Sequence, residues 1–363
     1  MSAITGTMAA AVYHGRGDVR VETRPVPVAS GGQALVKVLR SGICGTDATE
    51  WKSGPIIFPI DRPHPHSGHV GPLVIGHEFV GEIVDLPGGP VDGLAVGSHV
   101  ASGAGVSCGR CRRCLQGRTN LCERYATYGL NIDGGLAEYV AVEVSTLVAI
   151  PDGCELDHAG VAQPLAVGLH AARRSRVVDG DRVVLFGAGA IGTFILAGLV
   201  SIADADVTVV DFAGERLERA LRLGAARTVP VTDRVADDLR EVLGAAGADV
   251  VIEATGAPGQ LDAALRIVRP GGTILQVGLP AERQELDVHR LVMNEVTIES
   301  TLAHVCSDDL APALDILART NLGAELVESV HGLEEVPAQL ARLAAGEIRG
   351  KVLFDPTRTL SHR

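Results

Sequence analysis

The sequence predicts an α/β protein in which a β-rich domain is joined to a domain built on a doubly wound parallel sheet. Three observations indicate this fold class. Short β-branched runs separated by Gly and Pro fill residues from about 8 to 150, strand and helix patterns alternate from about 181 to 300, and a glycine-rich turn follows the first strand of the second region. With 363 residues the chain exceeds the usual size of one hydrophobic core, so two domains are expected.

Each region has its own strand pattern. In the first region the clearest strand-like runs are Ala34–Leu39, Phe79–Val84 and Glu138–Val142. In the second region the alternation predicts parallel strands at Arg182–Phe186, Val207–Asp211, Asp249–Glu253, Thr273–Val277 and Val296–Ser300. The uncharged stretch Val183–Ala203 has the length of a membrane span, but its glycines divide it into a strand, a turn and a buried helix.

The C-terminal segment predicts two amphipathic helices, near Asp308–Arg319 and Val336–Ala345, and then a strand at Gly350–Phe354. We expect this segment to return to the β-rich domain and complete it. The predicted organisation is therefore a first domain over residues 1–164, a nucleotide-binding domain over residues 165–305, and a return to the first domain over residues 306–363.

Composition excludes several classes of partner. The net charge is −12, only three of the 32 basic residues are lysines, and no basic run is present, so neither nucleic acid nor an anionic membrane is expected to bind. The first six residues have no pattern of an export signal, so we expect a cytoplasmic protein with reduced thiols.

Four cysteines give the sharpest signal in the chain. Cys108, Cys111, Cys114 and Cys122 form a C-x2-C-x2-C-x7-C cluster, a spacing that lets four thiolates close around one zinc ion. Two disulfides are the alternative, but x2 loops are hard to bridge within normal disulfide geometry. Such a closed site has no open coordination position, so the predicted zinc is structural and not catalytic.

The glycine-rich turn predicts a dinucleotide site. The motif G-x-G-x-x-G follows a strand and opens a helix, where backbone N–H groups favour a pyrophosphate. It consists of Gly187, Gly189, Ala190, Ile191 and Gly192 with the intervening Ala188.

An acidic residue at the end of the next strand strengthens that prediction. Asp211 lies nineteen residues after Gly192, where it could accept hydrogen bonds from ribose hydroxyls and repel a 2′-phosphate, which favours NAD over NADP. Arg216 and Arg219 on the next helix could soften this preference, and a helix N-cap is the alternative role for Asp211.

Two later strand ends complete the predicted cofactor site. Thr255 and the segment Val277, Gly278 and Leu279 would pack on the adenine and nicotinamide ends of a dinucleotide at the same sheet edge. Ordinary strand-to-loop turns are an equally good interpretation of each residue taken alone.

A second group of metal-ligating residue types lies outside the cysteine cluster. Cys44, Asp47, His77 and Glu78 offer a thiolate, an imidazole and carboxylates, all of which bind zinc. Taken singly, a lone Cys is usually a core residue and a His-Glu pair is usually a solvated turn.

The whole pattern resembles the zinc-dependent medium-chain alcohol dehydrogenases. The resemblance rests on the GxxC segment at Cys44, the GHE box at His77, the four-cysteine lobe and the later glycine motif, and it covers essentially the whole chain. Within that family, Gly54–His66 resembles the butanediol dehydrogenases, and Gln163–His170 resembles a segment of sorbitol and threonine dehydrogenases. The resemblance implies a GroES-like catalytic domain, a Rossmann domain and a homodimer or homotetramer.

The same resemblance assigns roles to individual residues. It implies that Cys44, His77 and Glu78 are ligands of a catalytic zinc, that Asp47 orients the histidine, and that Thr46 hydrogen-bonds the substrate alcohol. Zinc would lower the pKa of a bound hydroxyl, Thr46 would pass its proton outward, and hydride would leave the carbinol carbon for the nicotinamide. Each subunit would hold one catalytic and one structural zinc.

Two residues depart from the family pattern. Gln163 stands where the related segment has a glutamate, so a neutral amide replaces a carboxylate at or near the metal and would ligate it directly or through water. Thr49 stands where many relatives carry a histidine of the proton relay, so Thr49, Glu50 or water must release the proton.

The function predicted from the sequence is a reversible NAD-dependent dehydrogenase that oxidises a secondary alcohol of a vicinal diol or polyol to a ketone. One alternative is a metal-free NADPH-dependent quinone or alkene reductase of the same superfamily, which Cys44, the GHE box and Asp211 disfavour. The other is a non-catalytic nucleotide-binding protein that keeps the zinc lobe for assembly, and a count of bound zinc would distinguish it.

Overall fold

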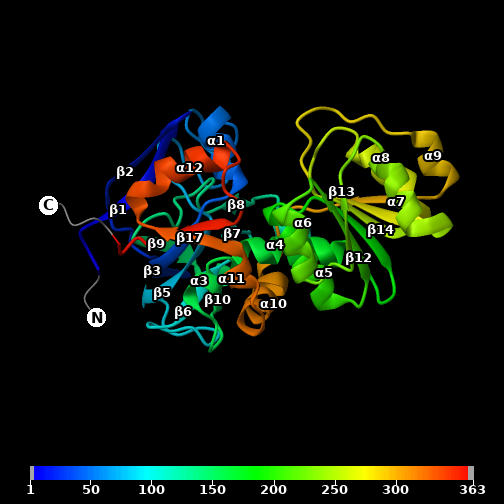
Figure 1. Ribbon diagram of the computed structural model, residues 1–363. Coiled ribbons are helices and arrows are strands. Elements are labelled where there is room, and N and C mark those ends of the chain that lie inside the picture. The colour runs from blue at the N-terminus through cyan, green and yellow to red at the C-terminus, as the bar shows by residue number, and fades with distance from the viewer. Residues whose placement is uncertain (1–3, 359–363) are drawn as a thin grey trace. The chain divides into compact units, whose positions relative to one another are not determined.

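The computed structural model describes residues 4–358, which divide into two compact units. The first unit runs up to Ala166 and resumes at Val305, and the second is Val167–His304. The two segments of the first unit are interleaved, because the orange and red C-terminal elements lie among the blue N-terminal strands in Figure 1. Helix α4 (Ala162–Arg174) contains the point at which the chain passes from one unit to the other.

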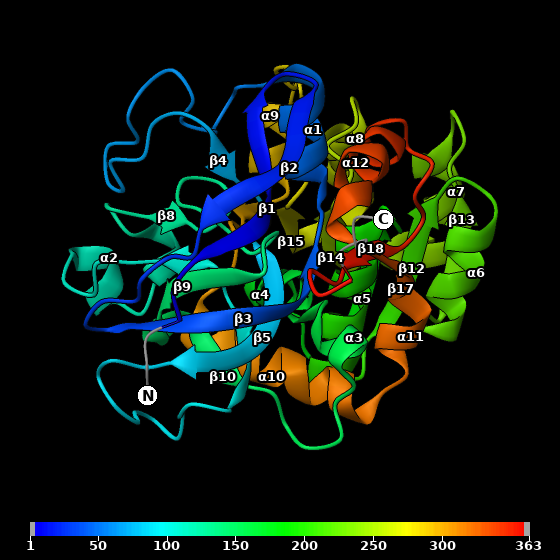
Figure 2. The same ribbon diagram turned by 90° about the vertical axis from the view of Figure 1, so that its left-hand side faces the viewer.

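The first unit is built from β-sheets. A seven-stranded sheet has the order β10-β6-β5-β3-β18-β17 with β9 also paired to β3, and two smaller sheets have the orders β2-β1-β4 and β7-β8 (Figure 2). Its strands are β1 (Thr7–Gly15), β2 (Asp18–Pro25), β3 (Gln33–Gly42), β4 (Leu73–Val74), β5 (Glu78–Asp85), β6 (His99–Ser102), β7 (Gly105–Val106), β8 (Ala126–Thr127), β9 (Tyr139–Glu143), β10 (Leu147–Ala149), β17 (Val327–His331) and β18 (Lys351–Phe354).

Helices of four to fourteen residues lie between these strands in the chain. They are α1 (Gly45–Ser53), α2 (Arg112–Leu115), α3 (Leu156–Ala159), α10 (Cys306–Arg319), α11 (Leu322–Leu326) and α12 (Val336–Ala344), with 3-10 turns at η1 (Thr119–Leu121), η2 (Val144–Thr146) and η4 (Leu333–Glu335). The C-terminal elements share a core with the N-terminal ones, since Leu340 of α12 and Phe354 of β18 pack in one cluster with Tyr13 and Ile75. The predicted return of the tail thus takes the form of a strand, β18, that pairs antiparallel with β3.

The second unit is the doubly wound parallel sheet that the sequence predicts. Its six strands have the order β13-β12-β11-β14-β15-β16, and every pairing is parallel. They are β11 (Arg182–Phe186), β12 (Asp206–Asp211), β13 (Arg227–Pro230), β14 (Ala248–Glu253), β15 (Val268–Gln276) and β16 (Thr297–Ser300). The sequence pattern did not single out β13, because this edge strand has only four residues and ends in a proline.

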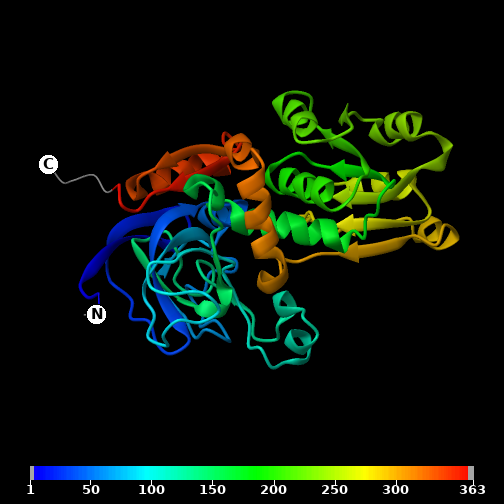
Figure 3. The same ribbon diagram turned by 90° about the horizontal axis from the view of Figure 1, so that it is seen from below.

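Helices cover both faces of this sheet (Figure 3). On one face, α5 (Ala190–Ile202) and α6 (Glu215–Arg222) pack their apolar side chains on the strands, as Leu196 and Leu217 illustrate. On the other face, α7 (Val235–Leu243) and α8 (Gln260–Ile267) do the same, and η3 (Gly244–Ala246) and α9 (Val288–Met293) complete the connections. The strand order reverses between β11 and β14, and the carboxyl ends of these two strands mark the ligand-binding edge of such a fold.

The uncharged stretch Val183–Ala203 divides into β11, a glycine turn and α5, as the sequence predicts. No helix within residues 4–358 combines the length and apolarity that crossing a membrane requires.

Candidate functional site

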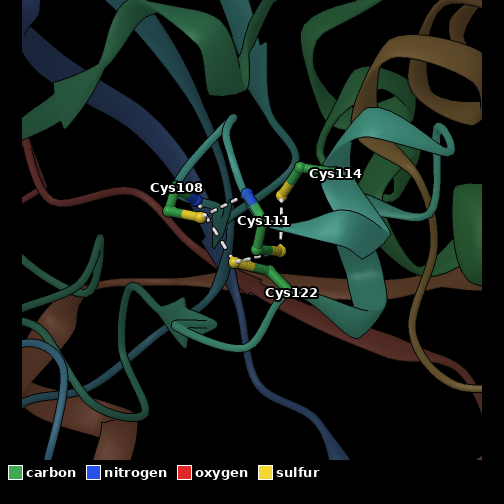
Figure 4. Close-up of side chains that lie close together, drawn as sticks. All are labelled: Cys108, Cys111, Cys114 and Cys122. Carbon is green, nitrogen blue, oxygen red and sulfur yellow. Dashed lines mark hydrogen bonds between the residues drawn. The ribbon is translucent and has the colours of Figure 1, made fainter.

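The four cysteines of the C-x2-C-x2-C-x7-C cluster meet in one small lobe. Cys111 caps helix α2, Cys114 lies within it, and Cys108 and Cys122 approach from the loops on either side. Figure 4 shows the four side chains directed toward one another. The Cys111 sulfur lies 3.5 Å from that of Cys114 and 4.0 Å from that of Cys122.

These spacings fit a shared metal ion better than disulfides. A tetrahedral zinc with Zn–S bonds of about 2.3 Å holds its sulfurs about 3.8 Å apart, whereas a disulfide needs about 2.05 Å. Backbone amides of Cys114 and Glu123 lower the pKa of the Cys111 thiol to about 6, while burial raises that of Cys122 to about 11. An amide-stabilised thiolate is the form of cysteine that binds zinc, so the donor set of the lobe fits the ion.

A second group of metal-ligating atoms forms around the start of helix α1. The ligand atoms of Cys44, Asp47 and His77 all lie within 4.8 Å of one another, and Cys44 Sγ is 3.0 Å from His77 Nε2. Cys44 is the N-cap of α1, since its Sγ accepts a hydrogen bond from the Thr46 amide at 3.2 Å. Asp47 Oδ2 accepts from the Cys44 amide at 2.9 Å, and this capping box fixes the thiol and the carboxylate together.

The electrostatics of this group favour a cation. Burial alone would lower the pKa of His77, but the negative charges of Cys44 and Asp47 outweigh it and raise the pKa to about 10. Burial raises the pKa of Asp47, whose Oδ1 lies 3.7 Å from His77 Nδ1. The two ring nitrogens of His77 therefore face a thiol and a carboxylate, the arrangement in which one nitrogen ligates a metal and the other is oriented by an acid.

Glu78 takes a different place from the one the GHE box implies. Its carboxylate is 2% exposed and forms an ion pair with Lys351 of β18, and it is outside the group formed by Cys44, Asp47 and His77. Lys351 Nζ also donates to the Ile43 carbonyl at 3.0 Å. Because Lys351 is itself buried, the pair neutralises two charges that would each be costly to bury alone.

The other residues of the predicted reactive site have distinct surroundings. Thr46 is partly buried beside Cys44, Thr49 is exposed, and Gln163 is partly buried at the second position of α4. Glu50 is 1% exposed, and its two carboxylate oxygens accept from the amides of Ile56 at 2.9 Å and Ile57 at 2.7 Å. Glu50 thus anchors the chain that follows α1.

In the second unit the glycine motif forms the turn between β11 and α5. Gly187 has a φ of 102°, and a Cβ on Gly192 would lie 1.9 Å from the Gly187 carbonyl oxygen, so no other residue fits there. A Cβ on Gly189 would meet open space, and Ala190 and Ile191 begin the helix. The turn thus brings strand and helix close together and leaves its second glycine accessible, as a pyrophosphate site requires.

Asp211 lies beside this turn. Its Oδ2 accepts from the Ala188 amide at 2.6 Å and its Oδ1 from the Phe212 amide at 2.7 Å. Arg216 approaches Oδ1 to 3.8 Å, and the buried Arg219 reaches the Ala188 carbonyl at 3.4 Å. The structure therefore connects the acid at the end of β12 directly with the glycine turn at the end of β11.

The sequence predicts that Glu253 ends a strand at the cofactor edge, together with Thr255, but it indicates no role for the Glu253 carboxylate itself. Glu253 ends β14 at 1% exposure and binds the backbone of Thr255 and Gly256, and the end of β15 contributes Gln276, Val277 and Gly278 beside it. An acid at the carboxyl end of the strand, after the apolar run Val250–Ile252, was the available signal. Thr255 and the segment from Val277 are thereby adjacent at one sheet edge.

Comparisons with known proteins place this geometry in a family. Residues 30–152 match the model of the alcohol dehydrogenase GroES-like domain, and residues 190–319 match that of the zinc-binding dehydrogenases. The chain is 32% identical to the sorbitol dehydrogenase of Bacillus subtilis over 80% of its own length and 81% of that protein. It is 33% identical to an L-threonine 3-dehydrogenase of Streptomyces coelicolor, over 92% and 94% of the two chains.

Solved structures agree with these relatives. The 2R,3R-butanediol dehydrogenase of Bacillus subtilis superposes with a TM-score of 0.87 at 29% identity, covering 96% of this chain and 99% of that one. Two further structures hold a cofactor. An alcohol dehydrogenase of E. coli CFT073 contains NADH (TM-score 0.85, 25% identity, 96% and 99% covered), and a protein of Sinorhizobium meliloti 1021 contains NADP (0.84, 27%, 97% and 100%). The chain belongs to the zinc-dependent medium-chain alcohol dehydrogenases, in the branch of the polyol dehydrogenases, and is an oxidoreductase.

Proposed function

We propose that this protein is a reversible NAD-dependent dehydrogenase that oxidises a secondary alcohol of a vicinal diol or polyol to a ketone. The observation that carries the proposal is the meeting of Cys44, His77 and Asp47 in a chain whose relatives include sorbitol and butanediol dehydrogenases. Family membership supports the reaction type, and the relatives support the substrate class.

We assign the catalytic zinc to Cys44 and His77, with Gln163 as a further ligand, directly or through water. When bound, the ion lowers the pKa of an alcohol hydroxyl and stabilises the charge that develops on its oxygen. Glu78 would join these ligands only by giving up its ion pair with Lys351. With the four-cysteine lobe, the proposal is two zinc ions per subunit.

The side chains around Cys44 would handle the proton. The Thr46 hydroxyl would hydrogen-bond the substrate alcohol. Asp47, whose Oδ1 lies 3.7 Å from His77 Nδ1, would orient the imidazole so that Nε2 faces the metal. The nicotinamide of NAD would supply the acceptor for the hydride of the carbinol C–H bond, and the hydroxyl proton would pass to solvent. We route that proton through Thr46 and the exposed Thr49, because both oxygens of Glu50 are already bound to backbone amides.

The anchoring role of Glu50 can be tested separately from proton transfer. Glu50→Gln keeps one oxygen that can accept from a backbone amide, but its side-chain NH2 group faces the second backbone amide, so two donors meet. We therefore expect the free energy of unfolding to fall by about 1–3 kcal/mol. The pH dependence of kcat should stay as in the unaltered protein. Thermal unfolding and a pH–rate profile measure the two effects, with the exposed Lys52→Gln on the same helix as control. An altered pH profile without loss of stability would return Glu50 to the proton path.

We propose NAD as the preferred cofactor because of Asp211. Asp211→Asn keeps an acceptor for the Ala188 amide but removes the charge that would repel a 2′-phosphate. We expect the ratio of kcat/KM for NAD to that for NADP to fall about tenfold or more, mainly through better use of NADP. Asp206→Asn at the other end of β12, where the carboxylate binds Arg227, is the matched control. An unchanged ratio would remove Asp211 from cofactor selection.

The substrate class is best tested with a panel of vicinal diols, sugar alcohols and amino alcohols offered with NAD and with NADP while the reduced cofactor is measured by absorbance. Turnover of diols or polyols with NAD and two zinc ions per chain are expected. Reduction of quinones or alkenes without zinc would favour the metal-free alternative, and one zinc without turnover would favour the non-catalytic one. The family also supports a homodimer or homotetramer, which light scattering would test.

A further inference from the structure

A buried carboxylate at the end of β14 makes an unusual number of hydrogen bonds. Oε1 of Glu253 accepts from the amide of Thr255 at 2.7 Å, from the amide of Gly256 at 3.1 Å, and from the Thr255 hydroxyl. Its Oε2 accepts from the Gly256 amide at 3.0 Å and from Gln276 Nε2 at 2.6 Å. Each of these partners is neutral, so the buried carboxylate is held by hydrogen-bond donors and not by an ion pair.

The Gln276 amide bridges this carboxylate to the adjacent strand end. Its Nε2 donates both to Glu253 Oε2 and to the Gly278 carbonyl at 2.7 Å. Because both neighbours are acceptors, only the nitrogen of the amide can face them, and the orientation of the side chain is fixed. The Glu253 backbone carbonyl adds two more links, accepting from the amides of Val277 at 2.8 Å and Gly278 at 2.9 Å.

These bonds hold together two loops that touch through their backbones. A Cβ on Gly278 would lie 2.1 Å from the Gly256 nitrogen and 2.7 Å from Glu253 Oε2. A Cβ on Gly187, in the glycine turn, would meet the Thr255 methyl at 3.0 Å. Any displacement of the Thr255 loop would therefore also displace the neighbouring ends of β11 and β15.

We propose that Glu253 and Gln276 are positioning residues for the dinucleotide: they fix the Thr255 loop and the Val277–Leu279 segment in the arrangement that receives the cofactor. This inference rests on the proposed function, since it takes those two segments to be cofactor-binding. The carboxylate acts through the backbone that it holds and has no contact of its own with the reacting atoms. Its role is to keep the carboxyl ends of β14 and β15 in register.

The chemistry of Glu253→Gln makes this role testable. The new side chain keeps one oxygen for Thr255 but turns an amide N–H toward Gln276 Nε2 and the Gly256 amide, which are both donors. The Gln276 side-chain amide can rotate so that its oxygen accepts from the new N–H group, but that oxygen would then also face the Gly278 carbonyl. Each arrangement leaves a buried conflict, so the two loops must move apart.

The experiment is a fluorescence titration of the zinc-loaded full-length protein with NADH, which measures binding without turnover. We expect Glu253→Gln to raise the Kd for NADH about tenfold or more, the change expected from losing hydrogen bonds to a buried charge. The KM for the alcohol should stay unchanged.

Asp249→Asn is the matched control, because Asp249 lies at the opposite end of the same strand and binds Arg269 at 2.6 Å and the Arg182 amide at 2.9 Å. It should lower the melting temperature without changing the Kd for NADH. If Glu253→Gln does not fold, Gln276→Met removes only the bridge and should raise the Kd in the same direction by a smaller factor.

The outcomes separate this inference from the proposed function. If the unaltered protein binds NADH and both the Glu253→Gln and Gln276→Met variants bind it equally well, the positioning role is wrong while the function stands. A Kd that rises equally in Asp249→Asn would also overturn it, since the effect would then be one of stability alone. If the unaltered protein binds neither NADH nor NADPH, the proposed function itself fails.

Discussion

Cys44→Ala is expected to reduce alcohol oxidation by about a thousandfold or more while leaving both units folded. The thiolate supplies a negative charge and one of the two ligands that the structure places in direct contact, with 3.0 Å between Cys44 Sγ and His77 Nε2. A Lewis acid contributes several kcal/mol of transition-state stabilisation, and loss of that contribution corresponds to about this factor in rate. His77→Ala should behave in the same way.

The structural cost of Cys44→Ala should be small. The Thr46 amide loses a sulfur acceptor at the start of α1, a change worth about 1 kcal/mol in typical N-caps, and the Asp47 half of the capping box remains. Circular dichroism and the melting temperature measure this, and metal analysis should find one zinc in the variant against the two that we expect in the unaltered protein. Cys154→Ala is the control, since Cys154 is in neither metal-ligating group found among residues 4–358. Wild-type activity in Cys44→Ala would disprove the proposed site.

The fold was predictable from the sequence where local pattern decides it. Alternating apolar strands and the glycine turn predict β11, β12, β14 and β15 within a few residues, because a buried parallel strand requires a continuous apolar run. Spacing alone also brings together Cys108, Cys111, Cys114 and Cys122, because all four lie within fifteen residues. In both cases the information is contained in neighbouring residues.

The parts that were not predictable join residues far apart in the chain. Lys351 meets Glu78 only because β18 returns to β3, and no local pattern indicates that a buried lysine would take the second acid of the GHE box. Gln276 meets Glu253 because β14 and β15 are neighbours, and the register of that pairing decides which side chains face each other. The sequence allows Glu50 to act as a base, but in the structure both of its carboxylate oxygens accept hydrogen bonds from the amides of Ile56 and Ile57.

Cys111→Ser is expected to unfold the four-cysteine lobe and leave the rest of the chain folded. The lobe has almost no apolar core: none of the residues of α2 is buried, and Leu115 is 77% exposed. Between Cys108 and Cys122 the only buried residues are Asn120 and Cys122 itself. Packing therefore cannot hold the lobe, and the metal must do so, as in zinc-finger peptides where the ion contributes about 10–16 kcal/mol.

Limited proteolysis with trypsin measures this directly, because the lobe carries exposed arginines at positions 110, 112, 113 and 124. In the zinc-loaded protein these sites should be protected by the closed site, and in Cys111→Ser they should be cut first, with metal analysis showing one zinc fewer. Cys154→Ala should be cut as slowly as the unaltered protein. Treating the unaltered protein with a chelator should reproduce the cleavage pattern of Cys111→Ser, because removal of the ion and removal of one ligand abolish the same tetrahedral site. Equal protection in all of these samples would mean that loop hydrogen bonds, such as that from the Cys108 amide to Cys122 Sγ at 3.2 Å, are sufficient to hold the lobe without metal.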